Sequence, residues 1–105
     1  MGRKKRDVSK AGTKFDNGKL RFSLIPEGVE ETLVKVLMEG AATYGDNNWQ
    51  LVEEARERYY NALRRHLDAW FYKGQIIDPA SGLHNMGHIL ANAAFLLWFD
   101  KNQSL

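Results

Sequence analysis

Three histidines and one aspartate are the residues whose types and spacing could do chemistry. His84 and His88 lie four residues apart in the stretch DPASGLHNMGH, Asp78 comes just before them, and His66 lies one predicted helix upstream. On a helix, His84, His88 and Asn92 fall at i, i+4 and i+8, so they form one polar stripe on an otherwise apolar surface. Buried polar groups of this kind must be hydrogen-bonded, ligated or exposed to a cavity.

Three interpretations of this stripe remain open. In the first, His84 and His88 bind a metal, with Asp78 or His66 completing the shell, because an i,i+4 histidine pair suits a first-row metal. In the second, the stripe lines a ligand pocket, and the imidazoles and Asn92 contact a phosphate or a base edge. In the third, His84 is a polar residue of a first helical turn, and His88 and Asn92 close hydrogen bonds in the core. Asp78 can cap backbone N–H groups, act as a ligand, or do both.

Three helices must position these residues. Apolar residues recur at helical spacing and predict helices over about 26–44, 51–72 and 83–101. His66 falls on the apolar face of the second helix. The third is apolar nearly all round, which is typical of a helix buried on several sides. We therefore expect an all-α fold, a bundle of three main helices with an N-terminal hooked loop or short hairpin at Asn17-Gly18, completed by oligomerisation.

Composition and charge bound the class of protein. A chain of 105 residues predicts one domain, here a basic disordered arm over 1–13 and a single helical domain over 14–105. The absence of cysteine excludes disulfides and thiolate chemistry and favours a cytoplasmic protein, and no run of about 18 apolar residues predicts a membrane span. Residues 1–21 carry a net charge of +6 and the remainder −4, so the front of the chain suits phosphate.

Cations close to a predicted turn are the candidate phosphate ligands. Lys14, Lys19 and Arg21 flank Asn17-Gly18, and a hooked loop with alternating cations could close over a phosphate; the alternative is a set of surface charges on a hairpin. Arg64 and Arg65 adjoin His66, and one of them could point toward the same cavity. The tryptophans are expected in the core rather than as stacking platforms.

Four motifs in order resemble a known family. The stretches KFDNGKLRFSLIP, YGDNNW, ALRRHLDAW and DPASGLHNMGHILANAAFLLW, which span residues 14–99, resemble the phage-borne dATP/dGTP diphosphohydrolase family of the N-terminal-domain type. That family is similar to the all-α nucleotide pyrophosphohydrolases, which act as oligomers and cleave (d)NTP to (d)NMP and pyrophosphate with Mg²⁺. The resemblance implicates residues of the loop, the turn and the pocket: Lys14, Asp16, Gly18, Lys19, Arg21, Tyr44, Gly45, Asp46, Asn48, Trp49, His66, Asp78, Ser81, Gly82, His84, His88 and Asn92.

One departure from the pattern concerns the metal. The all-α pyrophosphohydrolases use Glu-x-x-Glu followed by Glu-x-x-Asp; Glu27 and Glu30 supply the first half here, but the second half is missing. Either Asp46, Asp78 and glutamates hold a hard cation, or the chain binds nucleotides without hydrolysing them. We expect Mg²⁺ or Mn²⁺ as cofactor, with its ligands drawn from Asp46, Asp78, His84 and His88.

The expected function is that of a phage-type (d)NTP pyrophosphohydrolase. Asp78 or His88 would orient the attacking water. The substrate-binding residues would be Lys14, Lys19, Arg21, Asn48, Trp49, Arg65, His66, His84 and Asn92. The alternative is a non-catalytic sponge that sequesters nucleotide signals of host defence. Both readings place a homo-oligomer in the cytoplasm, that of the host cell if the chain is phage-encoded. Nucleic-acid binding is the weakest reading, because the basic arm lacks aromatics until Phe15.

Overall fold

The computed structural model describes residues 12–102, and within them the fold is all-α. Its elements in order are η1 (Phe22–Leu24), α1 (Val29–Tyr44), η2 (Asn48–Leu51), α2 (Ala55–Tyr72) and α3 (Asn85–Asn102). No strand occurs in this range, apart from a single antiparallel bridge between Ile77 and His84. The predicted fold class and the three helices are thereby confirmed, whereas most of the predicted disordered arm lies outside the described residues.

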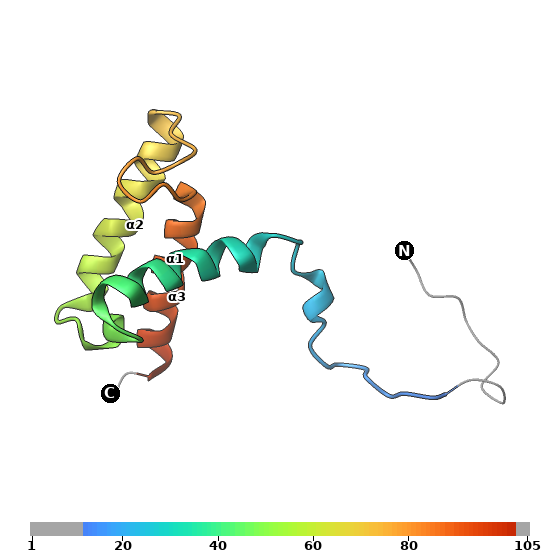
Figure 1. Cartoon of the computed structure of the whole chain (residues 1–105). Helices are drawn as coiled ribbons and strands as arrows, with labels where there is room; N and C mark the ends of the chain where they lie inside the picture. The colour runs from blue at the N-terminus through green and yellow to red at the C-terminus, as the bar shows by residue number, and fades with distance from the viewer. Residues whose placement is uncertain (1–11, 103–105) are drawn as a thin grey trace.

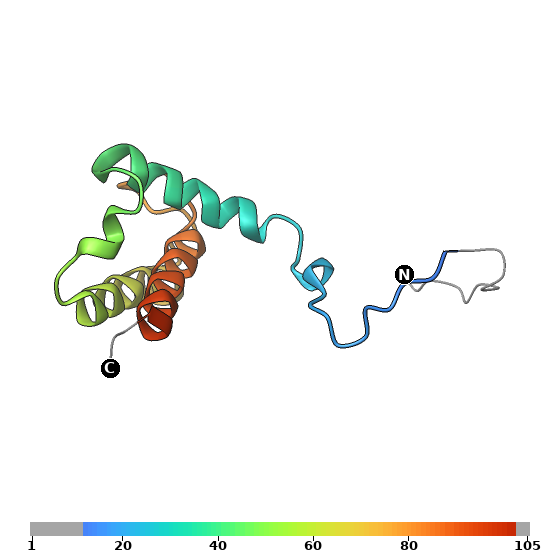
Figure 2. The same cartoon turned by 90° about the horizontal axis from the view of Figure 1, so that it is seen from below.

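The helices form a hairpin with a third helix laid across it. α2 and α3 run side by side in opposite directions, and α1 crosses α3 (Figure 1, Figure 2). The crossing is close at Gly87, where an added Cβ would lie 2.9 Å from Cγ2 of Thr32 and 3.0 Å from Cγ2 of Val36. Glycine at this position therefore lets the two backbones approach.

Each predicted helix begins a few residues too early. α1 begins at Val29 because Gly28 takes a left-handed conformation (φ 92°). α2 begins at Ala55 because Glu54 is also left-handed (φ 53°), an uncommon conformation for a residue with a side chain. α3 begins at Asn85 because the preceding His84 is held in the bridge to Ile77. The first residue of each helix is therefore set by turn conformations and tertiary contacts, which the periodicity of the apolar residues does not reveal.

Few side chains are fully buried. Within residues 12–102 the buried apolar side chains are those of Val36, Ala55 and Ala91, and the polar side chains of Asn85 and Asn92 are buried as well. Large apolar side chains on every helix are exposed. The radius of gyration is 18.9 Å, against about 13 Å for a compact domain of this length, mainly because the N-terminal segment runs away from the helices (Figure 1). Oligomerisation, which would cover this surface, stays a prediction.

Residues 14–25, the hooked segment, contain the predicted turn. The N–H of Lys19 donates to the carbonyl of Asp16 at 3.0 Å, and Gly18 adopts a positive φ of 81°. No strands pair around it within residues 12–102, so the segment is a hooked loop rather than a hairpin. No helix in the described part of the chain is long and apolar enough to cross a membrane.

Candidate functional site

The connection between α2 and α3 is organised by one buried asparagine. Asn85, the first residue of α3, has no exposed surface. Its Nδ2 donates to the carbonyl of Gln75 at 2.8 Å, and its N–H donates to the carbonyl of Ile76 at 2.8 Å. The donor role of Nδ2 makes Oδ1 the acceptor, so Nδ1 of His66, 2.7 Å away, carries the hydrogen. Asn85 thus joins both helices and their connecting loop.

A second set of polar contacts lies on the same connection. Ser81 Oγ is 2.7 Å from Nε2 of His88, and Asp78 Oδ2 is 3.7 Å from the same nitrogen. The N–H of Ser81 donates to Asp78 Oδ2 at 3.0 Å. The rings of His66 and His88 are stacked, with centroids 4.3 Å apart and planes 5° from parallel. We call these five residues, His66, Asp78, Ser81, Asn85 and His88, the hinge cluster.

The environment of the hinge cluster lowers the pKa of both His88 and Asp78. Burial lowers the pKa of His88, and the neighbouring His66 lowers it further, while Asp78 and Glu39 act in the opposite direction. For Asp78, burial opposes ionisation, but hydrogen bonds from Ser81 and the nearby imidazoles outweigh it, so the pKa of this carboxyl is lowered. Near neutral pH the cluster therefore holds an aspartate beside an uncharged His88, and the single hydroxyl hydrogen of Ser81 serves either Nε2 of His88 or the carboxylate of Asp78.

The other two members of the predicted stripe serve the backbone of α3. Nδ1 of His84 accepts a hydrogen bond from the N–H of Met86 at 2.9 Å, as an N-capping side chain does. Nδ2 of Asn92 donates to the carbonyl of His88 at 2.8 Å. The stripe therefore contains hydrogen bonds of the kind that the third interpretation requires, while the second nitrogen of each imidazole keeps its capacity for a ligand.

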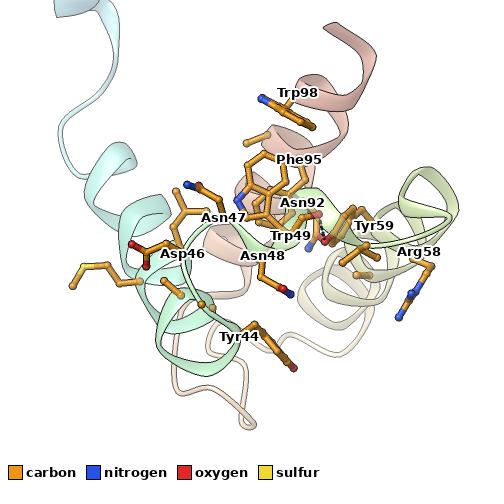
Figure 3. Close-up of a pocket in the computed structure, with 18 of the residues that line it drawn as sticks. Tyr44, Asp46, Asn47, Asn48, Trp49, Arg58, Tyr59, Asn92, Phe95 and Trp98 are labelled. Carbon is orange, nitrogen blue, oxygen red and sulfur yellow. Dashed lines mark hydrogen bonds between the residues drawn. The ribbon is translucent and has the colours of Figure 1, made fainter. Parts of the chain in front are cut away.

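A hollow of about 1110 Å³ lies between the end of α1, η2, α2 and α3. Its size is at the upper limit of the roughly 300–1,000 Å³ usual for small-molecule sites. Asn48 points into the space between Tyr44 and Tyr59, and Trp49 turns toward α3 (Figure 3). The hydroxyl of Tyr59 donates to the carbonyl of Trp49 at 2.9 Å, which ties η2 to α2. The hollow is therefore a site built by four elements of the chain.

Aromatic and carboxamide side chains dominate its lining. The ring of Trp49 stacks on Phe95 with centroids 4.5 Å apart and meets Trp98 edge-on at 5.1 Å. Trp49 and Trp98 therefore pack against other aromatic rings, but both are only half-buried, whereas they were expected in the core. Polar groups surround the aromatic wall: Asp46, Asn47, Asn48, Arg58, Asn61, Arg65 and Asn92. Such a surface offers ring faces, amide donors and acceptors, and two guanidinium groups to a ligand.

The predicted site residues fall into three places. Asp46, Asn48, Trp49, Arg65 and Asn92 line the hollow. His66, Asp78 and His88 form the hinge cluster with Ser81, and His84 caps α3; none of these lines the hollow. The cations Lys14, Lys19 and Arg21 lie on the hooked segment, away from both sites (Figure 1). Asn92 connects two of the places, because it lines the hollow and bonds to the backbone of His88.

Some residues of these sites escaped the sequence analysis. Asn85 stands between two histidines, and only its complete burial reveals its role. Arg58 and Asn61 are exposed polar residues that line the hollow. With Arg65 they recur at i, i+3 and i+7 on α2, so a search for polar as well as apolar periodicity would have found this stripe.

The predicted metal ligands do not gather in one place. Within residues 12–102 no group of three or more histidine and acidic side chains is arranged to hold a metal ion. Asp46 lies at the hollow, whereas Asp78 and His88 lie in the hinge cluster. A complete protein-made metal shell therefore does not fit the described residues of a single chain.

Fold and site together define an all-α domain with a helical hairpin, a polar hinge and a hollow of aromatic and carboxamide side chains. A family model described as "dATP/dGTP diphosphohydrolase, N-terminal" matches residues 9–105. The chain belongs to this family, as the motifs had indicated. A protein of Salmonella phage PMBT28 named dATP/dGTP diphosphohydrolase is 35% identical over 92 residues, which cover 88% of this chain and 31% of the phage protein. The chain thus spans less than a third of that relative, and no solved structure matches it.

Proposed function

We propose that the hollow binds a purine deoxynucleoside triphosphate and that the protein is a pyrophosphohydrolase that converts dATP or dGTP to the monophosphate and pyrophosphate. The observation that carries the proposal is the lining of the hollow, in which carboxamides, aromatic rings and arginines surround a space of about 1110 Å³. The family description and the printed name of the phage relative support this choice of substrate.

The carboxamides suit the base. A carboxamide offers a donor and an acceptor side by side, which matches the hydrogen-bonding edges of adenine and guanine. Asn48 on η2 and Asn61 on α2 both line the hollow.

The arginines suit the phosphates. Arg58 and Arg65 lie on one face of α2, about two turns apart, and both line the hollow. Guanidinium groups bind phosphate oxygens in pairs and stay charged at all relevant pH values. A nucleotide with its base near Asn48 would therefore direct its phosphates toward α2.

Asp46 is the carboxylate that the hollow offers to a divalent cation. Mg²⁺ commonly binds through one or two carboxylates together with substrate phosphates and water, so the described residues fit a cation that arrives with the nucleotide. When bound, such a cation supplies neutralisation of the leaving pyrophosphate. Asp78 and His88, the predicted residues for orienting the water, do not line the hollow and are linked to it only by the hydrogen bond from Asn92 to the backbone of His88, so we assign them no catalytic role there.

Pyrophosphate release tests the proposal. The protein is incubated with dATP or dGTP and Mg²⁺ or Mn²⁺, and pyrophosphate and monophosphate are measured. Arg65→Ala should lower turnover or raise KM at least tenfold, because it removes a phosphate ligand. Arg56→Ala is the matched control, since Arg56 is an exposed arginine of the same helix outside the hollow lining. Equal effects of the two substitutions would contradict the assignment of the hollow.

A nucleotide sponge is the second candidate function. It is favoured because the hollow has few carboxylates that could hold a catalytic cation: among the described lining residues, Asp46 is the only acidic one. A sponge would bind nucleotide in the hollow and release it intact after the protein is denatured. Recovery of intact nucleotide, with no pyrophosphate in the presence of either metal, would replace the hydrolase by the sponge.

A further inference from the structure

The hooked segment has a defined local shape but lacks apolar contacts. Its turn at Lys19 and the hydrogen bonds of η1, from the N–H of Leu24 to Arg21 and of Ile25 to Phe22, hold it together. Yet Phe15 is 82% exposed and Leu20 80%, and Phe22 and Leu24 are nearly as open. Figures 1 and 2 both show the segment leading away from the three helices. A run of exposed large apolar side chains of this kind marks a surface that binds a partner.

The hollow presents complementary features. Met38 and Tyr44, at the edge of the hollow, are exposed apolar side chains. The acidic residues Glu39 and Asp46 lie on the same part of the chain and are also exposed. The front of the chain is net positive and the remainder net negative. An apolar, cationic segment therefore matches an apolar, acidic edge.

The segment leads away from the hollow of its own chain. It joins α1 at the N-terminal end, whereas the hollow lies at the C-terminal end, where Leu37 to Gly45 contribute to its lining. A helix of 16 residues separates the two ends by about 24 Å. The left-handed Gly28 and the hydrogen bond from the N–H of Val29 to the carbonyl of Pro26 fix the turn by which the chain enters α1.

We propose that the hooked segment of one copy docks on the edge of the hollow of a second copy. Its apolar side chains cover Met38 and Tyr44 of that copy, and Lys14, Lys19 and Arg21 reach the mouth of the hollow. There they hold phosphates of the bound nucleotide; this last step rests on the proposed function, whereas the docking does not. A two-fold exchange makes the arrangement reciprocal, so each hollow is completed by the other chain.

The area involved is adequate for a stable pair. Each aromatic side chain carries roughly 150–250 Å² of surface, so two phenylalanines and two leucines contribute several hundred Å² from each copy. The reciprocal exchange doubles this, and the covered edge of the hollow adds a similar area. The total reaches the roughly 1,200–2,000 Å² of stable interfaces between proteins.

Mass in solution tests the docking. The full chain should be a dimer or higher oligomer by light scattering, and Leu20→Ser/Phe22→Ser should shift it to monomer, with its helical circular dichroism retained. Leu97→Ser is the control, since Leu97 is an exposed apolar residue of α3. A monomeric wild type, or an assembly that Leu97→Ser breaks and the segment variant does not, would overturn the proposal.

Mixing two defective variants tests whether the cations act on the other chain. Lys14→Ser/Lys19→Ser/Arg21→Ser has an intact hollow, and Arg65→Ala has an intact segment; each alone should bind dGTP at least tenfold more weakly than wild type. After mixing and exchange, half of the dimers are mixed, and each holds one site with both parts intact. About a quarter of all sites should therefore regain wild-type affinity for dGTP.

The results separate this inference from the proposed function. If the mixture regains no binding while wild type binds dGTP, the cations act within one chain or not at all, and the exchange is wrong. If wild type does not bind dGTP or dATP, the proposed function fails and, with it, the phosphate role of the segment. Docking is then decided by the mass measurement alone.

Discussion

The two ends of the helical hairpin differ in how many of their polar side chains have hydrogen-bond partners within the chain. At the hinge cluster the polar groups find partners inside the chain, and no buried side-chain nitrogen or oxygen in the described residues lacks one. At the hollow, by contrast, carboxamides and arginines face open space, and apolar side chains such as Met38 and Tyr44 are exposed. The polar groups of the hinge are thus satisfied within the chain, whereas Arg58, Asn61 and Arg65 at the hollow are exposed.

Asn85→Ala should have the largest effect on stability. It leaves the N–H of His66 and the carbonyl of Gln75 without a partner in a partly buried place, and each loss costs about 1–3 kcal/mol. We expect the free energy of unfolding, measured with urea, to fall by about 2–4 kcal/mol. Asn61→Ala, an exposed asparagine at the hollow, should change it by less than about 0.5 kcal/mol. Similar losses of unfolding free energy for the two variants would contradict the proposed difference between the hinge and the hollow.

Gly87→Ala tests the crossing of α1 and α3. The added methyl group would meet Thr32 Cγ2 at 2.9 Å and the backbone oxygen of Thr32 at 3.2 Å, so overpacking should destabilise by about 1–3 kcal/mol. Gly40→Ala has nothing within 4 Å of the new Cβ and lies inside α1; it should stabilise by about 0.5–1 kcal/mol. Thermal unfolding of both variants measures the pair, and a stabilised Gly87→Ala would show that the helices can move apart freely.

Asp78→Asn tests the charge in the hinge. Because the pKa of Asp78 is lowered in the fold, its carboxylate stabilises the protein at pH values above its unfolded pKa, and this contribution is lost as the pH falls through the folded pKa. We expect a loss of about 1 kcal/mol at pH 7, because a hydrogen bond to a charged group contributes more than one to a neutral group, and we expect variant and wild type to converge as the pH falls below the ordinary aspartate pKa of about 3.9. Unfolding curves over this range give the profile. A difference that grows with acidity would reverse the assigned sign, and Asp46→Asn is the exposed control from the hollow.

Tyr59→Phe should have the smallest effect and should show where the two regions meet. It removes the hydrogen bond to the carbonyl of Trp49, at a cost of about 0.5–1 kcal/mol. Because this bond ties η2 to α2, we also expect weaker nucleotide binding, which isothermal titration with dGTP would measure. Tyr60→Phe, on the neighbouring exposed tyrosine, is the control. Equal effects from the two would mean that η2 does not depend on this bond.

The sequence predicted the helices well and the places of the site residues only in part. Apolar periodicity identified all three helices, because it reflects burial directly. His66 and His88 do lie together beside Asp78, but they are bonded to Asn85 and Ser81 and do not line the hollow, which was expected beside them. The position of the hollow was not predicted. It depends on η2, which folds against the helices through Trp49 and Tyr59, and no local pattern in the sequence encodes that contact.

The helix starts and the buried Asn85 were missed for related reasons. Gly28 and Glu54 end the preceding turns through left-handed backbone conformations, and glutamate gives no sequence signal for such a conformation. Asn85 takes its role from a carbonyl ten residues away, on Gln75. The contact of Asn85 therefore connects residues that a local pattern does not relate, whereas Glu54 adopts a conformation that its residue type does not signal.

The left-handed residues Asn47 and Glu54, which stand on either side of η2, have a consequence for how the hollow opens. For Glu54 this conformation costs roughly 1–2 kcal/mol, whereas asparagine adopts it more readily, so the short segment between them releases strain, mainly at Glu54, when it detaches. Amide protons of 48–51 should therefore exchange with deuterated solvent well before those of α2 and α3. A ligand could then enter the hollow during a brief local unfolding of η2, while the rest of the chain stays folded.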